Sequence, residues 1–252
     1  HRWLHININD PVERNAWNLS IDIFWAAILS GVASFNAMFA VRLGASNSDI
    51  GLLTSLPALV AILISFPAGR FLSTRRQRKP WILWSLAIHR TGYLVLALLP
   101  LLKFFDLPVG QLVLWLIILN TFPVQIFNIG WVASLAEAVP EDRRASFFGL
   151  RNIIANVTVS VTVFLGGIFL NQVIFPVNYQ ILYLVGFAAS MLSQFFLVRV
   201  DAPEKQAPQQ PAVRRSLRET LGSLARFFRE QPAFTRIVRN TFLYAVGIWM
   251  AT

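Results

Sequence analysis

The sequence contains no cysteine and only three histidines, and these shortages exclude several kinds of chemistry. Without thiols the chain has no disulfide framework, no cysteine nucleophile and no thiolate-bound zinc or iron–sulfur cluster. His1, His5 and His89 are too few for a histidine-rich metal site. The sequence also lacks a Gly-x-x-x-x-Gly-Lys-Ser/Thr loop, so the chain does not hydrolyse ATP through a P-loop. We therefore expect neither a metal nor a cofactor.

Charged residues are scarce as well. They make up 13% of the 252 residues, whereas 56% are hydrophobic and the mean hydropathy is +0.57. A soluble domain carries about 25% charged residues, and half of that cannot cover a water-exposed surface of this size. A soluble enzyme, a disordered tail and a disulfide scaffold are therefore poor interpretations. The composition and the long apolar runs predict an all-α membrane protein.

Six apolar runs are long enough to cross about 30 Å of hydrocarbon as helices. They cover residues 17–43, 50–72, 81–102, 111–139, 146–173 and 179–198. A seventh run begins near Ile237 and is still apolar at Thr252, where it amounts to about 24 Å of helix. Because the chain also opens on histidine, we expect a fragment that ends inside a seventh helix. The expected domains are a six-helix transmembrane bundle over 1–200, a cytoplasmic linker over 201–236 and a truncated helix 7 over 237–252.

The linker is expected to contain an amphipathic helix. Residues 201–212 are rich in proline and glutamine, which is typical of flexible linkers. The apolar residues that then recur at helical spacing are Val213, Leu217, Leu221, Leu224 and Phe228. Arginines occupy the opposite face, so this helix could lie on the inner membrane surface beside anionic lipid headgroups. A solvated connector helix that packs on the bundle explains the same pattern.

The positions of the basic residues predict the orientation of the chain. Of the 22 lysines and arginines, 19 lie in or beside four segments: the N-terminus, the joint between the second and third spans, the joint between the fourth and fifth, and the stretch after the sixth. The positive-inside rule then places the N-terminus in the cytoplasm, in a multi-pass protein of the plasma (inner) membrane. The formal charge of +10 is therefore mainly a topology signal. No nucleic-acid partner is expected, because the aromatic residues lie in the apolar spans and not along a basic groove.

The segment after the second span carries a resemblance to a known family. Its matching residues are Gly69, Arg75, Arg76, Arg78 and Lys79. With the second basic segment at 140–144, this arrangement resembles the major facilitator superfamily, whose signature loop joins helices 2 and 3. Ser73 and Arg76 stand where the family has an aspartate and a second glycine, so the charge-relay role of that aspartate is not carried over. Ordinary positive-inside anchoring is the alternative explanation of the basic cluster.

The resemblance implies both a fold and a function. It implies one half of a twelve-helix transporter, and this half consists of two inverted three-helix repeats. In agreement with such a repeat, residues 50–52 and 148–150 have similar sequences at the starts of the second and fifth spans. It implies a secondary-active or facilitative transporter, not an enzyme, that moves a small solute by alternating access with the missing C-terminal half of the same chain. The alternatives are the membrane-spanning domain of an ATP-driven transporter and a membrane-embedded enzyme. The glycine pattern of the drug–proton antiporters is matched only at Gly166 and Gly167.

Polar residues inside the spans predict a transport path, because each needs a partner or a water-filled cavity in the membrane. The candidates are Asp22 and Asn36 in the first span, Thr121, Gln125 and Asn128 in the fourth, and Asn152 and Asn156 in the fifth. The resemblance places helices 1 and 4 around a central cavity, with helix 5 beside it. We therefore expect these residues to line the path; hydrogen bonding between helices is the alternative.

Two charge pairs are predicted. Arg90 lies about 14 Å inside the third span, where an unpaired arginine costs from about 2.5 to more than 10 kcal/mol. Asp22 is the acidic residue deepest in the spans, so we predict an Asp22–Arg90 pair with a structural role, while the adjacent His89 hydrogen-bonds between helices. Glu137 and Arg151 flank the joint between the fourth and fifth spans and are predicted to latch an inner gate. A solvated pair worth less than about 1 kcal/mol is the alternative there.

Overall fold

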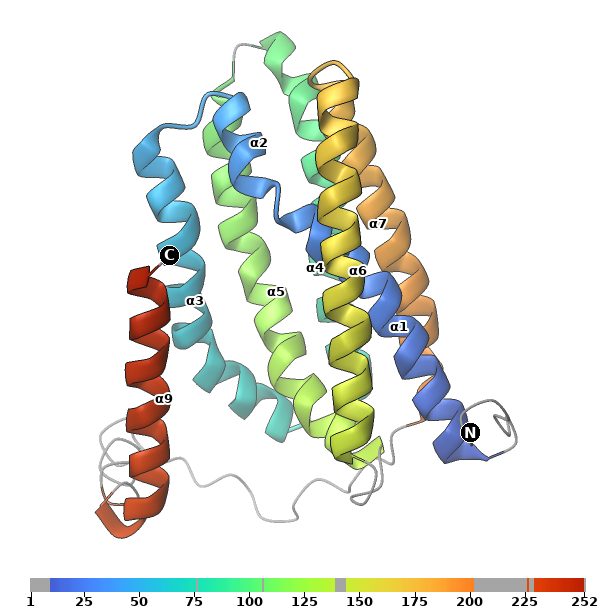
Figure 1. Cartoon of the computed structure of the whole chain (residues 1–252), viewed down its shortest axis with the longest axis vertical. Helices are drawn as coiled ribbons and strands as arrows, with labels where there is room; N and C mark the ends of the chain where they lie inside the picture. Colours follow the sequence, from blue (N-terminus) through green and yellow to red (C-terminus); the bar gives the residue numbers. More distant parts are fainter. Residues whose placement is uncertain are drawn as a thin grey trace. The chain divides into compact units, whose positions relative to one another are not determined.

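The computed structural model describes residues 10–75, 77–105, 107–138, 144–201, 226 and 229–251. Its helices are α1 (Pro11–Ala33), α2 (Asn36–Arg42), α3 (Asn47–Ser73), α4 (Lys79–Leu98), the 3-10 helix η2 (Leu99–Phe105), α5 (Val109–Ala138), α6 (Arg144–Gln172), α7 (Val177–Val198) and α9 (Pro232–Ala251) (Figure 1). No strand occurs in this part of the chain. Six spans are long and apolar enough to cross a membrane, with α1 and α2 forming the first. The predicted all-α membrane fold is confirmed.

The helices begin earlier than the apolar runs suggest, and at α1 and α3 polar capping residues precede the run. Asp10 caps α1 by accepting a hydrogen bond from the Val12 amide at 3.0 Å, and Pro11 occupies the first turn. A capping box of Ser46 and Asp49 starts α3, in which each side chain accepts from the other residue's backbone amide. As a result, α1 starts six residues before the predicted boundary and α3 starts three residues before it.

The first span is broken where a continuous helix was predicted. Helix α1 ends at Ala33 and α2 begins at Asn36. Just before the break, the hydroxyls of Ser30 and Ser34 donate to the carbonyls of Ala26 and Ser30 in the preceding turn. Such back-bonding competes with the helix hydrogen bonds and bends helices. The break therefore has a local cause, although neither proline nor glycine lies at it.

The pattern of helix pairs shows two inverted three-helix repeats. Helix α1 packs on α7 as α4 packs on α5, and α1 packs on α6 as α3 packs on α5, while α4 and α7 pack on each other. Every one of these pairs is reproduced when the first three spans are exchanged with the last three. Because the first span rises in Figure 1 and the fourth descends, the axis of this exchange lies in the membrane plane. The predicted bundle of two inverted three-helix repeats is confirmed.

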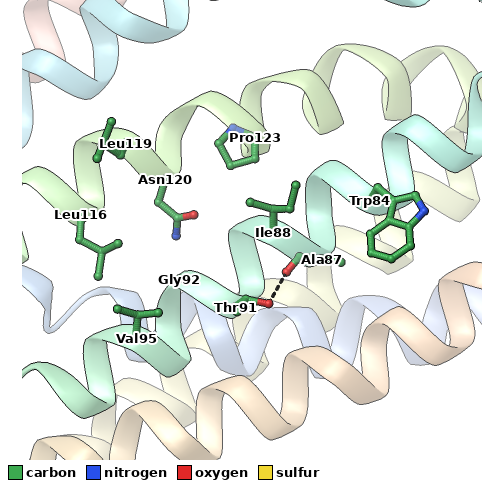
Figure 2. A pocket seen from close by; sticks show the side chains of 10 residues that line it. All are labelled: Trp84, Ala87, Ile88, Thr91, Gly92, Val95, Leu116, Leu119, Asn120 and Pro123. Carbon is green, nitrogen blue, oxygen red and sulfur yellow. Dashed lines mark hydrogen bonds between the residues drawn. The ribbon is translucent and has the colours of Figure 1, made fainter.

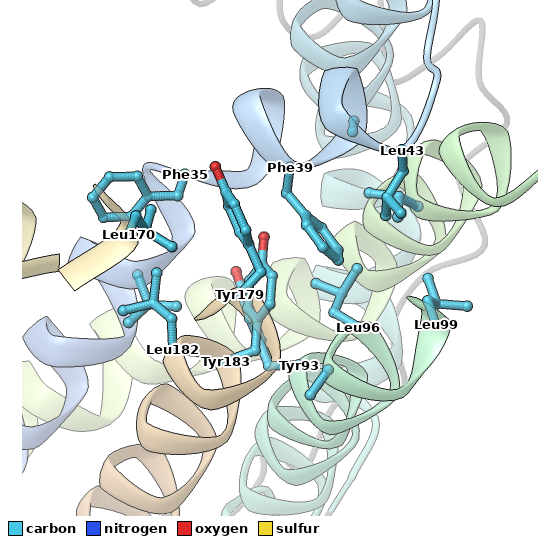
Figure 3. Packing of buried hydrophobic residues seen from close by; sticks show 14 of the residues in the cluster. Phe35, Phe39, Leu43, Tyr93, Leu96, Leu99, Leu170, Tyr179, Leu182 and Tyr183 are labelled. Atoms are coloured by element: carbon cyan, nitrogen blue, oxygen red, sulfur yellow. The ribbon is translucent and has the colours of Figure 1, made fainter. Parts of the chain in front are cut away.

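Two apolar clusters fill the ends of this bundle. The lower core lies where α1, α4 and α6 begin, and it consists of Leu19, Leu86, Phe147, Leu197 and Val200. The larger upper core is built around Phe39, whose ring lies 4.9 Å from that of Tyr179 and 5.0 Å from that of Tyr183 (Figure 3). Along α1 and α4, Asp22 and Arg90 lie between the residues of the two cores. A charged layer thus separates two apolar ones.

Residues 208–252 form a separate unit, and its helix α9 is described by itself. Helix α9 begins at Pro232, five residues before the predicted start of a seventh span at Ile237. It is not among the six spans found in the described residues. The amphipathic helix predicted after residue 212 lies outside the described residues, apart from Arg226 and Arg229.

Candidate functional site

Asp22 is the centre of a buried ionic network. The residue is 3% exposed, yet it carries a formal charge within a membrane-spanning helix. Nη2 of Arg151, in α6, lies 2.9 Å from Oδ2 of Asp22, and Nε of Arg151 donates to the Leu19 carbonyl at 3.5 Å. Charge and hydrogen bonds together are what a buried carboxylate requires. This contact joins α1 to α6.

Ser193 extends the network from Asp22 to Arg90. Its hydroxyl donates to Oδ1 of Asp22 and accepts from Nη2 of Arg90, both at 2.5 Å. Nη1 of Arg90 donates to Oε1 of Gln194 at 2.8 Å, and the amide of Gln194 in turn donates to the Leu83 carbonyl at 3.0 Å. The network therefore ties α1, α4, α6 and α7 together in the layer between the two cores.

Asp22 and Arg90 belong to one network, as predicted, but their side chains are joined through Ser193. Both residues are described, and no ion pair joins them; the Ser193 hydroxyl lies between. Arg151 takes the direct position instead. Helix α6 begins at Arg144, so Arg151 lies seven residues inside it and reaches the depth of Asp22. The sequence analysis placed Arg151 at the beginning of the fifth span and paired it with Glu137. It did not include Ser193, although the Ser193–Gln194 polar pair in an apolar span was a visible signal.

The predicted gate pair involves the same arginine. Glu137 belongs to the last turn of α5, but its side chain lies outside the described residues, so the latch stays a prediction. On its other side, the Arg151 guanidinium carbon lies 5.8 Å from the centre of the Trp131 ring of α5. Arg151 thus stands between α1, its own helix α6 and α5. A cation over an aromatic face gains about 0.5–2 kcal/mol.

Three of the predicted path residues make hydrogen bonds within the bundle. Asn36 accepts from the Tyr183 hydroxyl at 2.9 Å, and Gln125 donates to the Ser65 hydroxyl at 2.9 Å. The Thr121 hydroxyl donates to the Ile117 carbonyl of its own helix at 3.2 Å. Because all three side chains are partly exposed, these bonds leave each with an accessible surface.

The other predicted path residues, Asn128, Asn152 and Asn156, are exposed. Their amides have no hydrogen-bond partner among the described residues. Asn128 lies about 15 Å from the lower end of α5, while Asn152 and Asn156 lie about 12 and 18 Å from the lower end of α6. Three amides without a partner among the described residues therefore occupy similar depths on two consecutive spans.

The basic segment between α3 and α4 anchors helix ends. The ammonium group of Lys79 donates at 2.8 Å to the carbonyls of Val198 and Val200, at the end of α7. The guanidinium of Arg75 lies 4.6 and 4.8 Å from the rings of Phe71 and Trp81. Of the remaining signature residues, Gly69 lies where an added Cβ would be 3.9 Å from Ile129, and Arg78 occupies the N-cap position of α4 without a side-chain cap. Arg76 lies outside the described residues.

A shallow groove runs along the outer side of α4 and α5 (Figure 2). Its lining includes Trp84, Ile88, Gly92, Leu119 and Asn120, and it is largely apolar. Behind it, Nδ1 of His89 lies 3.2 Å from the Asn120 carbonyl, and the Asn120 amide donates to the His89 carbonyl at 2.9 Å. The predicted role of His89 as a hydrogen-bonding group between helices is confirmed.

The comparison with protein families agrees with this architecture. Among the described residues, no group of three or more potential ligands could hold a metal ion. The model of the Major Facilitator Superfamily matches residues 23–252. No curated protein and no solved structure matches the chain. The chain belongs to the Major Facilitator Superfamily, and it is an integral, multi-pass membrane transporter of that type.

Proposed function

We propose that the protein moves a small solute across the membrane by alternating access, along a path lined by Asn36, Thr121, Gln125, Asn128, Asn152 and Asn156. The observation that carries this proposal is the exposure of the Asn128, Asn152 and Asn156 amides on membrane-spanning helices. An amide without a hydrogen bond costs about 2 kcal/mol or more in an apolar medium. Water in a passage can hydrogen-bond to three such amides at similar depth, whereas lipid tails cannot.

The helix packing supports a path beside α5 and α6. Helices α1 and α5 approach each other chiefly through α2, at the upper end, so the lower parts of the two helices diverge. Arg151 of α6 and Trp131 of α5 lie at the space between the diverging lower parts of α1 and α5. Asp22, which is buried, contributes to the path by holding Arg151 in place. The inverted repeat supplies the two packing arrangements that rocking of the helices requires.

We further propose that the lower end of the bundle faces the cytoplasm, in a plasma (inner) membrane. The basic residues Arg70, Arg75, Arg78, Lys79 and Arg144 lie at this end. Positive charge near the ends of membrane helices favours the cytoplasmic side. The anionic headgroups of the inner leaflet would meet these residues.

Thiol labelling tests the path directly, because the sequence contains no cysteine and an introduced thiol has no competitor. The variants N128C, N152C and N156C should react with a charged, water-soluble methanethiosulfonate reagent in membranes. The matched controls are I153C and V157C, which lie next to the asparagines on α6 and are 62% and 58% exposed. These apolar positions should stay unreactive because they face lipid. Equal reactivity at asparagine and control positions would overturn the proposed path.

A further inference from the structure

Among the described residues, the buried ionic network carries one more positive than negative charge. Arg90 and Arg151 are two cations, and Asp22 is the one carboxylate that contacts the network among the described residues. His89, beside Arg90, hydrogen-bonds to the backbone of α5 and supplies no negative charge. An uncompensated charge inside a membrane protein is expensive unless a counter-charge reaches it.

The two arginines differ in how completely the chain occupies them. Arg90 is 3% exposed and donates to both Ser193 and Gln194. The Arg151 side chain is 14% exposed, and its Nη1 atom makes no hydrogen bond to the described chain. We therefore assign the excess positive charge to the Nη1 edge of the Arg151 guanidinium, which is the edge that does not contact Asp22.

The surroundings of this edge are suited to a ligand. Trp131 lies against the Arg151 guanidinium, and Asn128 lies three residues earlier on α5, on the same face of the helix. The Asn128 amide is exposed and has no partner in the described chain. A cation, a neutral donor and an aromatic wall therefore meet beside the proposed path. Guanidinium groups bind carboxylates and phosphates through paired, charge-assisted hydrogen bonds.

We infer that the transported solute is an anion carrying a carboxylate or phosphate group, bound by the free edge of Arg151 with Asn128 as a second donor. This inference rests on the proposed function and gives it a substrate class. On binding, the solute would neutralise the excess charge of the network while Asp22 holds the other edge of Arg151. An anionic lipid headgroup has the same chemistry, so the experiment has to separate the two sources.

The test is uptake into liposomes of neutral phosphatidylcholine that contain the protein. The probes are radiolabelled benzoate, inorganic phosphate, glucose and choline, which represent two anions, a neutral solute and a cation. We expect uptake of at least one anion and of neither glucose nor choline. The variant R151Q should reduce that uptake at least about tenfold, because one charge-assisted hydrogen bond is lost. R151K, which keeps the positive charge, should retain part of it.

A matched variant separates binding from structure. D22N/R90Q breaks the same salt bridge as R151Q but keeps the positive charge of Arg151. Its anion uptake should fall below that of the wild type, because Asp22 no longer holds Arg151, and should stay above that of R151Q. R151Q is expected to fold, because Asp22 keeps Arg90 through Ser193; gel filtration and the melting temperature check this. If D22N/R90Q does not fold, R151K against R151Q gives the same contrast.

The outcomes distinguish the two proposals. Uptake of glucose or choline without uptake of an anion would overturn the inference and support the proposed function. Uptake of no anion, or anion uptake that R151Q leaves unchanged, would also overturn the inference. A third outcome is that no soluble anion is taken up, while anionic lipid added to the liposomes raises the melting temperature of the wild type but not of R151Q. In that case the Arg151 edge binds a lipid headgroup, and the inference fails. Failure of the proposed function itself would appear in the thiol labelling, which needs no substrate.

Discussion

Asp22 and Arg90 face each other across the hydroxyl of Ser193, with no direct ion pair between them. The arrangement leaves one edge of the Asp22 carboxylate for Arg151, so α1 is tied to α6 and α7 at once. A direct Asp22–Arg90 pair would have linked α1 to α4 without involving α7. The serine therefore turns a pair of charges into a layer that holds four helices.

Loss of the Ser193 hydroxyl should destabilise the bundle. In S193A, Oδ1 of Asp22 and Nη2 of Arg90 lose their shared partner inside the protein, which costs about 2–4 kcal/mol. The control is S190A, one turn away, because Ser190 is equally buried but bonds only to the Phe187 carbonyl of its own helix. Unfolding of the purified variants in detergent measures both. Equal stability of S193A and S190A would show that the network contributes little.

Two buried tyrosines of the upper core should respond differently to loss of the hydroxyl. The Tyr179 hydroxyl has no partner in the described part of the chain, whereas that of Tyr183 donates to Asn36. Y179F should therefore be as stable as the wild type or slightly more so, because the substitution removes an unpaired polar group. Y183F should lose about 1 kcal/mol. Melting temperatures in the same detergent compare them, and a Y179F variant less stable than Y183F would contradict the assignment.

Close packing of α4 on α5 should make Gly92 intolerant of a side chain. A Cβ at this position would lie 2.4 Å from the amide nitrogen of Asn120, which is already bonded to the His89 carbonyl. G92A should lose about 1–3 kcal/mol through overpacking, and part of this should return in G92A/N120A. Gly149, with nothing within 4 Å, is the control, because alanine should be tolerated there. If G92A and G149A melt together, the packing described for Gly92 is incorrect.

Hydropathy and charge predicted the number and class of the spans because those features follow from composition and period. The helix starts were harder to place. Polar caps such as Asp10 and Ser46 belong to the helices, although apolar runs do not include them. The break after Ala33 was missed because its local cause, back-bonding by Ser30 and Ser34, does not interrupt the apolar run.

The site was predicted in its parts but not in its pairing. The sequence indicates that Asp22 and Arg90 both need partners, since each is a charge inside an apolar span. Which partner each takes depends on the rotation and depth of four helices, and sequence spacing within one helix does not determine these. Arg151 was placed correctly in the first turns of the fifth span, but its contact with Asp22 was not predicted. The roles of Ser193 and Gln194 were not predicted, because uncharged polar residues do not require an ionic partner in an apolar span.

The most direct test of the account is the side from which a thiol at position 156 can be reached. Asn156 lies about 18 Å along α6, close to mid-membrane, so alternating access should open it to each side in turn. N156C should react with a membrane-impermeant maleimide in both right-side-out and inside-out vesicles, while V157C should react in neither. Reaction of N156C from one side alone, or from neither, would contradict transport by alternating access along this path.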